Sequence, residues 1–251
     1  MNHTGLPQAN QSVVAIIPAR FSSSRLPGKP LMDIAGRPMI LHVLERALAA
    51  PSVSRAVVAT DDERICDVVR ACGFEAVMTS ASHASGSDRL AEAARDIEAD
   101  VVVNVQGDEP LISPETIEKA VAALLEDEGA AVSTTCERIE TAADVLSADV
   151  VKVVSDERGR ALYFSRSPVP FPREAARRHG SLAAALEAEP ELLALFRKHT
   201  GLYVYRRAFL LEYARWPQSA CERAESLEQL RILERGRPIR VVEATSPSIG
   251  V

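Results

Sequence analysis

A loop with three fixed positive charges follows the first apolar run of the chain, residues 13–17. Its chemically informative residues are Arg20, Ser23, Arg25, Gly28 and Lys29. Arginine forks and lysine ammonium groups both bind phosphate oxygens, and glycine lets the backbone approach a ligand closely. In an open α/β sheet, ligands bind at the carboxyl ends of strands. The loop therefore predicts a polyanion site, with a nucleoside triphosphate as the natural candidate; a solvated basic loop is the alternative.

The loop differs from the two common glycine-rich phosphate motifs. Ser23 occupies the place where the first glycine of a Walker A motif would precede Gly28 and Lys29. The spaced glycines of a dinucleotide-binding fingerprint are missing as well. We therefore interpret the loop as a different kind of triphosphate cradle.

A second polar motif, residues 103–110, ends another apolar run. In a doubly wound sheet it would lie beside the basic loop. Asp108 is placed to hold a divalent cation against phosphates, and Mg²⁺ is typically bound by few carboxylates and several waters. Asn104 and Gln106 add polar groups at the mouth of the site. The alternative is a turn in which Asp108 caps the helix that starts near Ser113.

The composition is that of an ordinary globular protein, with 251 residues, 47% hydrophobic and 25% charged. A formal charge of −6 argues against a general binder of nucleic acid or of anionic membranes. No apolar run approaches membrane-spanning length, and the start of the chain lacks an apolar signal region. The scattered cysteines indicate reduced thiols. We therefore expect a cytoplasmic protein without nucleic-acid or membrane partners.

Short apolar runs alternate with segments of helical periodicity in the first part of the chain. Buried parallel strands are predicted for residues 13–17, 56–59, 75–78, 101–105 and 131–135. Helices are predicted between them, near residues 39–48, 65–72 and 117–125. This alternation predicts the α/β class, with a doubly wound, mostly parallel sheet.

The pattern changes after about residue 149. A hairpin is predicted for residues 151–154 and 161–165, further strands for 200–206 and 239–244, and helices for 208–216 and 224–234. We expect a flexible tail over residues 1–11 and a single domain over residues 12–251. Within that domain, residues 150–206 are predicted to form an inserted, mixed α/β subdomain.

The basic loop, residues 20–31, resembles the signature of the sugar-acid cytidylyltransferases. The motif at 103–110 resembles the second signature of the branch that activates 3-deoxy-manno-octulosonate (Kdo). Further matching segments follow in order at residues 83–89, 161–166, 199–206 and 222–231. The resemblance covers nearly all of residues 12–251. It implies a nucleotide-diphospho-sugar transferase-like fold in which residues 150–206 serve sugar binding and dimerisation.

The resemblance also implies a role for each matching residue. CTP would be bound by Arg20, Ser23, Arg25, Lys29, Ser85, Gly86 and Arg89. The sugar acid would be bound by Gln106, Arg166, His199, Tyr203, Glu222, Glu225 and Gln229. Catalysis would depend on Arg20, Arg25, Lys29 and Asp108, with Asp108 as a magnesium ligand.

Periodicity supports part of the sugar-acid assignment. Strand alternation places four residues on one face, namely His199, Gly201, Tyr203 and Tyr205. Two aromatic rings with polar tips and a histidine around a glycine gap suit a sugar ring, whereas a lone histidine would more often be structural. Helical spacing places three residues near one helix face, namely Glu222, Glu225 and Gln229. A solvated charged face is the alternative there.

The sequence departs from the family pattern in two regions. Ser87 and Asp88 stand where the family more often has Thr and Glu, which keeps the chemistry. The family also continues past Gly250-Val251 with an Asp-Thr pair, whose aspartate is a second metal ligand, and with a closing helix. The printed sequence ends at Val251. We expect it to omit that segment; the alternative is a protein with an incomplete metal site.

The resemblance implies a homodimeric, magnesium-dependent enzyme that joins CTP and Kdo into CMP-Kdo and pyrophosphate for lipopolysaccharide biosynthesis. The anomeric hydroxyl of Kdo would attack the α-phosphorus of CTP. One alternative is a cytidylyltransferase for a related sugar acid, such as 8-amino-Kdo or sialic acid. The other is a nucleotide-binding protein that has lost catalysis.

Overall fold

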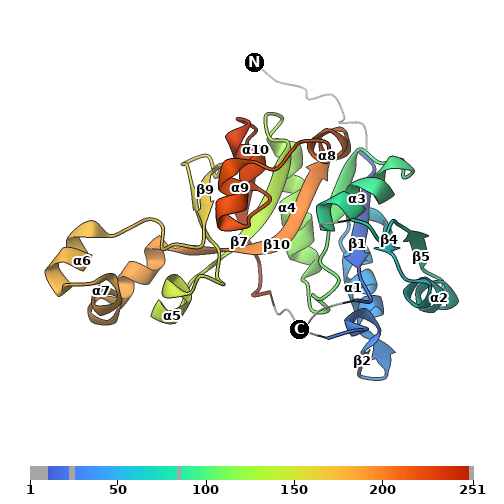
Figure 1. The fold of residues 1–251 in the computed structure, drawn as a ribbon, viewed down its shortest axis with the longest axis horizontal. Helices are drawn as coiled ribbons and strands as arrows, with labels where there is room; N and C mark the ends of the chain where they lie inside the picture. Colours follow the sequence, from blue (N-terminus) through green and yellow to red (C-terminus); the bar gives the residue numbers. More distant parts are fainter. Residues whose placement is uncertain (1–10, 23–25, 84–85, 249–251) are drawn as a thin grey trace, which may run out of the picture. The chain divides into compact units, whose positions relative to one another are not determined.

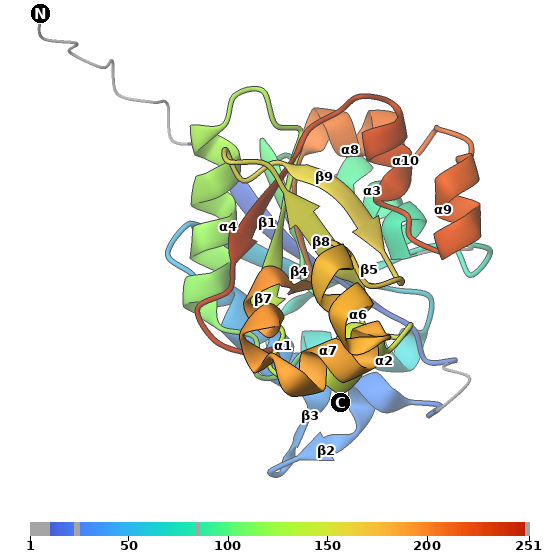
Figure 2. The ribbon, with the colours of Figure 1, turned by 90° about the vertical axis from the view of Figure 1, so that its left-hand side faces the viewer.

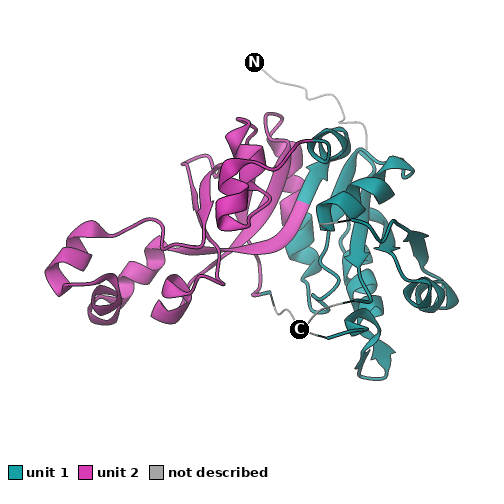
Figure 3. Ribbon diagram, in the orientation of Figure 1, with its two compact units in different colours: residues 1–118, 204–215, 248–251 teal, residues 119–203, 216–247 magenta. Residues whose placement is uncertain are grey.

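The chain forms two compact units in a computed structural model, which describes residues 11–22, 26–83 and 86–248. The first unit comprises residues 1–118, 204–215 and 248–251, and the second comprises residues 119–203 and 216–247 (Figure 3). Helix α4 (Pro114–Glu126) and strand β10 (Arg197–Arg206) each begin in one unit and end in the other. The predicted tail, single domain and inserted subdomain stay predictions.

The first unit is built on parallel strands in the order β6-β1-β4-β5, of which β1, β4 and β5 are labelled in Figure 1. Its strands are β1 (Val13–Ala19), β2 (Asp33–Ile34), β3 (Arg37–Pro38), β4 (Val53–Thr60), β5 (Glu75–Met78) and β6 (Val101–Asn104). Its helices are η1 (Lys29–Leu31), α1 (Met39–Leu48), α2 (Glu63–Ala71), α3 (Gly86–Arg95) and α8 (Arg207–Tyr213). The α/β class with a mostly parallel sheet is confirmed.

Apolar runs account for these strands because the sheet is covered on both faces. In β1, Ile16 and Ile17 are completely buried, and Val102 and Val103 of β6 are equally buried. Helix α1 buries a stripe of apolar residues at helical spacing, namely Met39, Ile40, Val43, Leu44 and Ala47. These buried strands position the loops that follow their carboxyl ends.

The second unit contains strands in the order β11-β7-β10, with the hairpin β8–β9 attached through β8. Figure 2 labels β7 and the two strands of the hairpin. Its remaining strands are β7 (Val132–Arg138), β8 (Lys152–Ser155), β9 (Ala161–Ser165) and β11 (Ile239–Glu243). Its remaining helices are α5 (Ala142–Leu146), α6 (Arg173–His179), α7 (Leu182–Ala188), η2 (Pro190–Leu195), α9 (Ala220–Glu225) and α10 (Leu230–Glu234). A small apolar core of Ile139, Val145, Leu186 and Phe196 joins α5 and α7 to this unit.

The predicted helix over residues 224–234 is wrong. The chain forms two short helices there, α9 and α10, with a break between them. Ser226 ends α9 in the left-handed region at φ 53°, and its N–H donates to the carbonyl of Glu222. A residue in that conformation cannot continue an α-helix, so the periodicity is interrupted.

Two further observations concern the described residues. The antiparallel pair β2–β3 was missed, because two-residue strands leave no periodic pattern in the sequence. Within residues 11–22, 26–83 and 86–248, none of the helices combines the length and the apolar character that crossing a bilayer requires.

Candidate active site

The strand order of the first unit reverses at β1. The chain passes outward from β1 to β4 and β5, and then returns through α3 to β6 on the other side of β1. Parallel sheets bind ligands outside the carboxyl ends of their strands at such a reversal. The basic loop follows β1, and residues 105–110 follow β6. The prediction that the two polar motifs lie beside each other is confirmed.

A pocket of about 200 Å³ lies where these two loops meet. It is lined by Pro18, Ala19, Arg20, Lys29, Pro30, Met39, Gln106, Gly107 and Asp108. Three predicted CTP or catalytic residues therefore share one cavity. Gln106, which was predicted for the sugar acid, lines the same cavity, while the other predicted sugar-acid residues belong to the second unit.

Two of the charged groups of this pocket form an ion pair, and the third binds a main-chain carbonyl. Lys29 Nζ donates to Asp108 Oδ2 over 2.7 Å, and the Asp108 side chain remains 47% exposed. Arg20 Nη2 donates to the carbonyl oxygen of His83 over 3.1 Å. With the described residues, Arg20 makes no other side-chain hydrogen bond, so its remaining donors can serve an anion in the pocket.

Two glycines allow the close contacts of the pocket walls. Gly28 has φ 76°, its N–H donates to the carbonyl oxygen of Phe21 over 2.8 Å, and a Cβ there would lie 3.1 Å from the Phe21 ring. A Cβ on Gly107 would lie only 2.8 Å from the carbonyl oxygen of Pro18. The Pro18 carbonyl cannot move aside cheaply for a side chain at residue 107, and the positive φ at residue 28 would strain any residue with a Cβ, so both motifs need glycine at these positions.

Several predicted CTP residues lie at or beyond the limits of the described chain. Ser23, Arg25 and Ser85 fall outside the described residues. Gly86 is the first residue of α3. The roles of all four in CTP binding stay predictions.

Arg89 is completely buried, unlike a typical nucleotide contact. Its Nη2 donates to Asp61 Oδ2 over 2.6 Å, and its Nη1 bonds to Thr79 Oγ1. Asp61 directly follows β4, the strand next to β1. In this structure the guanidinium thus holds the residues that follow β4 and β5. Direct contact between Arg89 and CTP stays a prediction, and the burial favours a supporting role.

His199 and Tyr203 share one face of β10, as strand alternation predicts. Their ring centroids are 5.3 Å apart, and the ring of Phe164 on β9 packs edge-on against His199 at 5.1 Å. The His199 side chain also hydrogen-bonds to Thr134 over 2.9 Å. Burial lowers the pKa of His199 to about 3, so the imidazole is neutral at physiological pH.

The expectation of one shared helix face for Glu222, Glu225 and Gln229 is wrong, because the break at Ser226 separates Gln229 from the two glutamates, which both lie on α9. Glu222 is 3% exposed and forms a two-pronged ion pair with Arg231, with nitrogen–oxygen distances of 2.8 and 2.7 Å. It also accepts from the N–H of Ser219 in a capping box. These contacts assign Glu222 a structural task at the start of α9.

Glu225 and Arg166 are joined in a second network. The carboxylate of Glu225 accepts from the Ser165 hydroxyl and from the Arg166 N–H, over 2.7 and 2.9 Å. Arg166 Nε donates to the carbonyl oxygen of Glu225 over 2.6 Å, and Nη1 donates to that of Ala148 over 2.9 Å. The guanidinium is thus engaged with main-chain carbonyls. Contact of either residue with the sugar acid stays a prediction.

Lys152 is a buried lysine that binds the main chain next to that network. It is completely buried, and its Nζ donates to the carbonyl oxygens of Ser147, Val150 and Arg166 over 2.6–2.7 Å. Burial lowers the pKa of this ammonium group, and nearby Glu225 partly offsets the shift. The lysine fixes the main chain of Arg166.

Gln229 has an amide group that the described protein leaves unsatisfied. The residue is 6% exposed, and its Nε2 is buried without a hydrogen-bond partner among the described residues. A buried donor of this kind costs free energy unless water or a ligand accepts from it. Its predicted place on the sugar-acid side is compatible with that observation.

Sequence reasoning missed the polar residues that hold the predicted ones, chiefly the buried Thr134 and Lys152 and the partly buried Asp61. The signal was available, since Thr134 and Lys152 are polar residues within predicted strands and Asp61 comes two residues after one.

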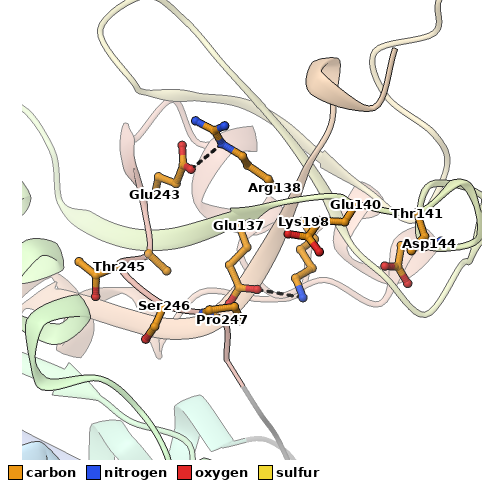
Figure 4. Close-up of a pocket in the computed structure, with 11 residues that line it drawn as sticks. Glu137, Arg138, Glu140, Thr141, Asp144, Lys198, Glu243, Thr245, Ser246 and Pro247 are labelled. Carbon is orange, nitrogen blue, oxygen red and sulfur yellow. Dashed lines mark hydrogen bonds and ion pairs between the residues drawn. The ribbon is translucent and has the colours of Figure 1, made fainter. Parts of the chain in front are cut away.

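Sequence reasoning also missed a second pocket, of about 270 Å³, in the second unit (Figure 4). Its walls include the ion pairs Glu137–Lys198 and Arg138–Glu243. No residue predicted for the site lines this pocket.

The first-unit pocket suits a magnesium ion carried by a polyphosphate. Asp108 supplies one half-exposed carboxylate, and the described residues contain no cluster of three or more acidic, histidine or cysteine ligands. Mg²⁺ is commonly held by one or two carboxylates together with substrate phosphates and water. The donor set fits an ion that enters with its nucleotide.

Comparison with known proteins places these motifs in a family. The family model described as "Cytidylyltransferase" matches residues 14–239. A 3-deoxy-manno-octulosonate cytidylyltransferase of Trichlorobacter lovleyi is 54% identical to this chain, and the alignment covers 95% of this chain and 93% of the relative. The enzyme of the same name from Escherichia coli is 46% identical, and the alignment covers 95% of this chain and 90% of that enzyme.

Solved structures agree with this placement. A CMP:2-keto-3-deoxy-manno-octonic acid synthetase complexed with CTP superposes with a TM-score of 0.84, at 45% identity over 96% of this chain and 93% of that one. A 4-diphosphocytidyl-2C-methyl-D-erythritol synthase from Anaerococcus prevotii, 13% identical with a TM-score of 0.59, shares the fold. The motifs, the pocket at the strand reversal and the relatives agree, and the chain belongs to the cytidylyltransferase family.

Proposed function

We propose that this chain is a 3-deoxy-manno-octulosonate cytidylyltransferase, which converts CTP and Kdo into CMP-Kdo and pyrophosphate. The observation that carries the proposal is the pocket between the loops after β1 and β6, where Arg20, Lys29 and Asp108 meet. Relatives of 46–54% identity that bear this name support the choice of substrates.

The reaction is a single in-line displacement at phosphorus. A bond forms between the anomeric oxygen of Kdo and the α-phosphorus of CTP, while the bond from that phosphorus to the bridging oxygen breaks. The hydroxyl proton passes to solvent, and pyrophosphate leaves. Positioning and charge stabilisation supply most of the acceleration in such transfers, so no general base is required.

The residues of the pocket would divide this work. Arg20 and Lys29 would neutralise the charge that develops on the departing pyrophosphate, assisted by Arg25 and Ser23. Asp108 would hold Mg²⁺, which when bound supplies positive charge at the phosphates and lowers the pKa of the attacking hydroxyl. The ion pair between Lys29 Nζ and Asp108 Oδ2, at 2.7 Å, places the two side chains side by side. This proximity supports a joint role at the phosphates.

Turnover is tested by pyrophosphate release from CTP, Kdo and Mg²⁺, with sialic acid and 8-amino-Kdo as competing substrates. We expect Kdo to be the preferred acceptor. Release with sialic acid or 8-amino-Kdo in place of Kdo would change the substrate assignment. Binding of CTP without release of pyrophosphate from any acceptor would instead support a nucleotide-binding protein that has lost catalysis.

Variants test the roles of the pocket residues. Lys29→Ala and Asp108→Asn should each lower kcat by about a hundredfold or more, because each removes charge stabilisation at the reacting phosphates. Lys119→Ala is the matched control, since Lys119 is an exposed lysine outside the pocket. Circular dichroism should show an unchanged fold for all three. Full activity of Lys29→Ala would contradict the assignment of the pocket.

We further propose that the enzyme acts in the cytoplasm as a homodimer and supplies CMP-Kdo for lipopolysaccharide biosynthesis. The substrates in the names of the relatives, Kdo and CTP, support the supply of CMP-Kdo. Light scattering of the purified chain tests the dimer. A monomeric mass at working concentration would contradict it.

A further inference from the structure

The hydroxyl group of Thr134 makes two hydrogen bonds at once. Thr134 lies on β7 and is completely buried. Its Oγ1 is 2.8 Å from the carbonyl oxygen of Leu202 and 2.9 Å from Nε2 of His199, both on the neighbouring strand β10. All these atoms belong to the second unit.

Counting protons assigns the direction of both bonds. A carbonyl oxygen can only accept, so the single proton of the Thr134 hydroxyl is donated to Leu202. The hydroxyl oxygen then accepts from Nε2 of His199, which must carry a proton. The reverse arrangement would leave two oxygen lone pairs facing each other at 2.8 Å with no proton between them.

The surroundings keep the imidazole in its neutral form. Burial lowers the pKa of His199 to about 3. The elements packed against the ring contribute Thr134 from β7 and Phe164 from β9, and neither is charged at neutral pH. On its own strand the ring contacts Tyr203, and the main-chain N–H of His199 donates to the carbonyl oxygen of Val151 over 2.8 Å. A neutral ring with a proton on Nε2 carries its lone pair on Nδ1.

We propose that Thr134 is a positioning residue that fixes His199 as the Nε2–H tautomer, so that Nδ1 serves as a hydrogen-bond acceptor for a hydroxyl group of the sugar acid. With the described residues, Nδ1 forms no hydrogen bond, which leaves the acceptor available. The lone pair on Nδ1 of a neutral imidazole cannot bind the carboxylate of the sugar acid, which also only accepts. Nδ1 therefore selects a hydroxyl group, which can donate a proton. The tautomer follows from this structure alone, and the identity of the hydroxyl donor rests on the proposed function.

The tautomer is measured directly on the full chain without substrates. Histidine labelled with ¹⁵N gives distinct long-range ¹H–¹⁵N patterns for protonated and unprotonated ring nitrogens. The chain has five histidines, and His199→Gln identifies the signals of His199. We expect a protonated Nε2 and an unprotonated Nδ1 at about pH 7. A proton on Nδ1, or equal populations of the two tautomers, would overturn the proposal.

Variants of Thr134 test whether this residue positions the His199 ring or only stabilises the fold. Thr134→Val removes the hydroxyl and should give a mixture of tautomers of His199. KM for Kdo should rise about tenfold, because the acceptor on Nδ1 is then only partly populated. KM for CTP and kcat should change much less. Thr134→Ser should restore the wild-type spectrum and KM. Thr135→Val is the matched control, because Thr135 is equally buried but bonds to Thr200 instead of His199.

The outcomes separate the two proposals. Should Thr134→Val fail to fold, the wild-type and Thr134→Ser spectra still decide the tautomer. A Thr134→Val protein with the wild-type spectrum and KM would refute the role of Thr134. An Nε2–H signal in a chain that releases no pyrophosphate would leave the tautomer established and refute the proposed function instead.

Discussion

At the scale of single residues, the sequence identifies the groups that could do chemistry, and the structure distinguishes those that face a pocket from those that hold others in place. Arg20, Lys29 and Asp108 line the first-unit pocket. Arg89 and Glu222 are buried in ion pairs, at 0% and 3% exposure. Residue type and spacing are the same for both kinds of role, so burial was needed to tell them apart.

His199 should make the protein sensitive to mild acid. Burial lowers its pKa to about 3 in the folded state, whereas an unfolded histidine titrates near 6.5. The unfolded chain therefore binds the additional proton between these values, so stability is lost as the pH falls below about 6.5. Between about pH 6.5 and 5 the loss from this residue should be about 2 kcal/mol.

Urea unfolding of the wild type and of His199→Gln at several pH values checks this effect. The variant lacks the titrating group, so its stability should fall less steeply with acidification than that of the wild type. Contributions of the carboxylates cancel in the difference between the two proteins. Parallel pH dependences would show that His199 is protonated as easily in the folded chain as in the unfolded one.

At the scale of elements, predictions succeeded where a local pattern determines the structure. The runs at 75–78 and 161–165 became β5 and β9, and the turn at 156–159 joins β8 to β9 with Gly159 at φ 71°. The helix at 224–234 failed because its break depends on Ser226 and on an ion pair nine residues apart in sequence. Local periodicity carries no information about such a pair.

The break between α9 and α10 should depend on the pair Glu222–Arg231. Glu222→Ala leaves the buried guanidinium of Arg231 without its carboxylate, which should cost about 3–5 kcal/mol in the free energy of unfolding. Glu174→Ala is a suitable control, since its pair with Arg177 is exposed and should change stability by less than about 0.5 kcal/mol. Denaturant titration measures both. An unchanged stability of Glu222→Ala, together with a raised KM for Kdo, would show that Glu222 contacts the sugar acid.

At the scale of the whole molecule, the reversal of strand order explains why two motifs about eighty residues apart in sequence form one pocket. The alternation of strands and helices was enough to predict this juxtaposition. Two of the boundaries between the compact units were not predictable in the same way, because they fall inside α4 and β10, where the local sequence shows no interruption.

The distribution of charge over the chain leads to a prediction about salt. The chain has a formal charge of −6, yet its pocket gathers Arg20 and Lys29 where a triphosphate would bind. Screening weakens attraction between partly exposed charges as the Debye length falls from about 30 Å at 0.01 M salt to about 3 Å at 1 M. KM for CTP should therefore rise several-fold between about 0.05 and 0.5 M salt, while KM for the singly charged sugar acid changes less. Lys29→Gln should raise KM for CTP at low salt and flatten its salt dependence, whereas equal salt dependences for both substrates would contradict an electrostatic role for this pocket.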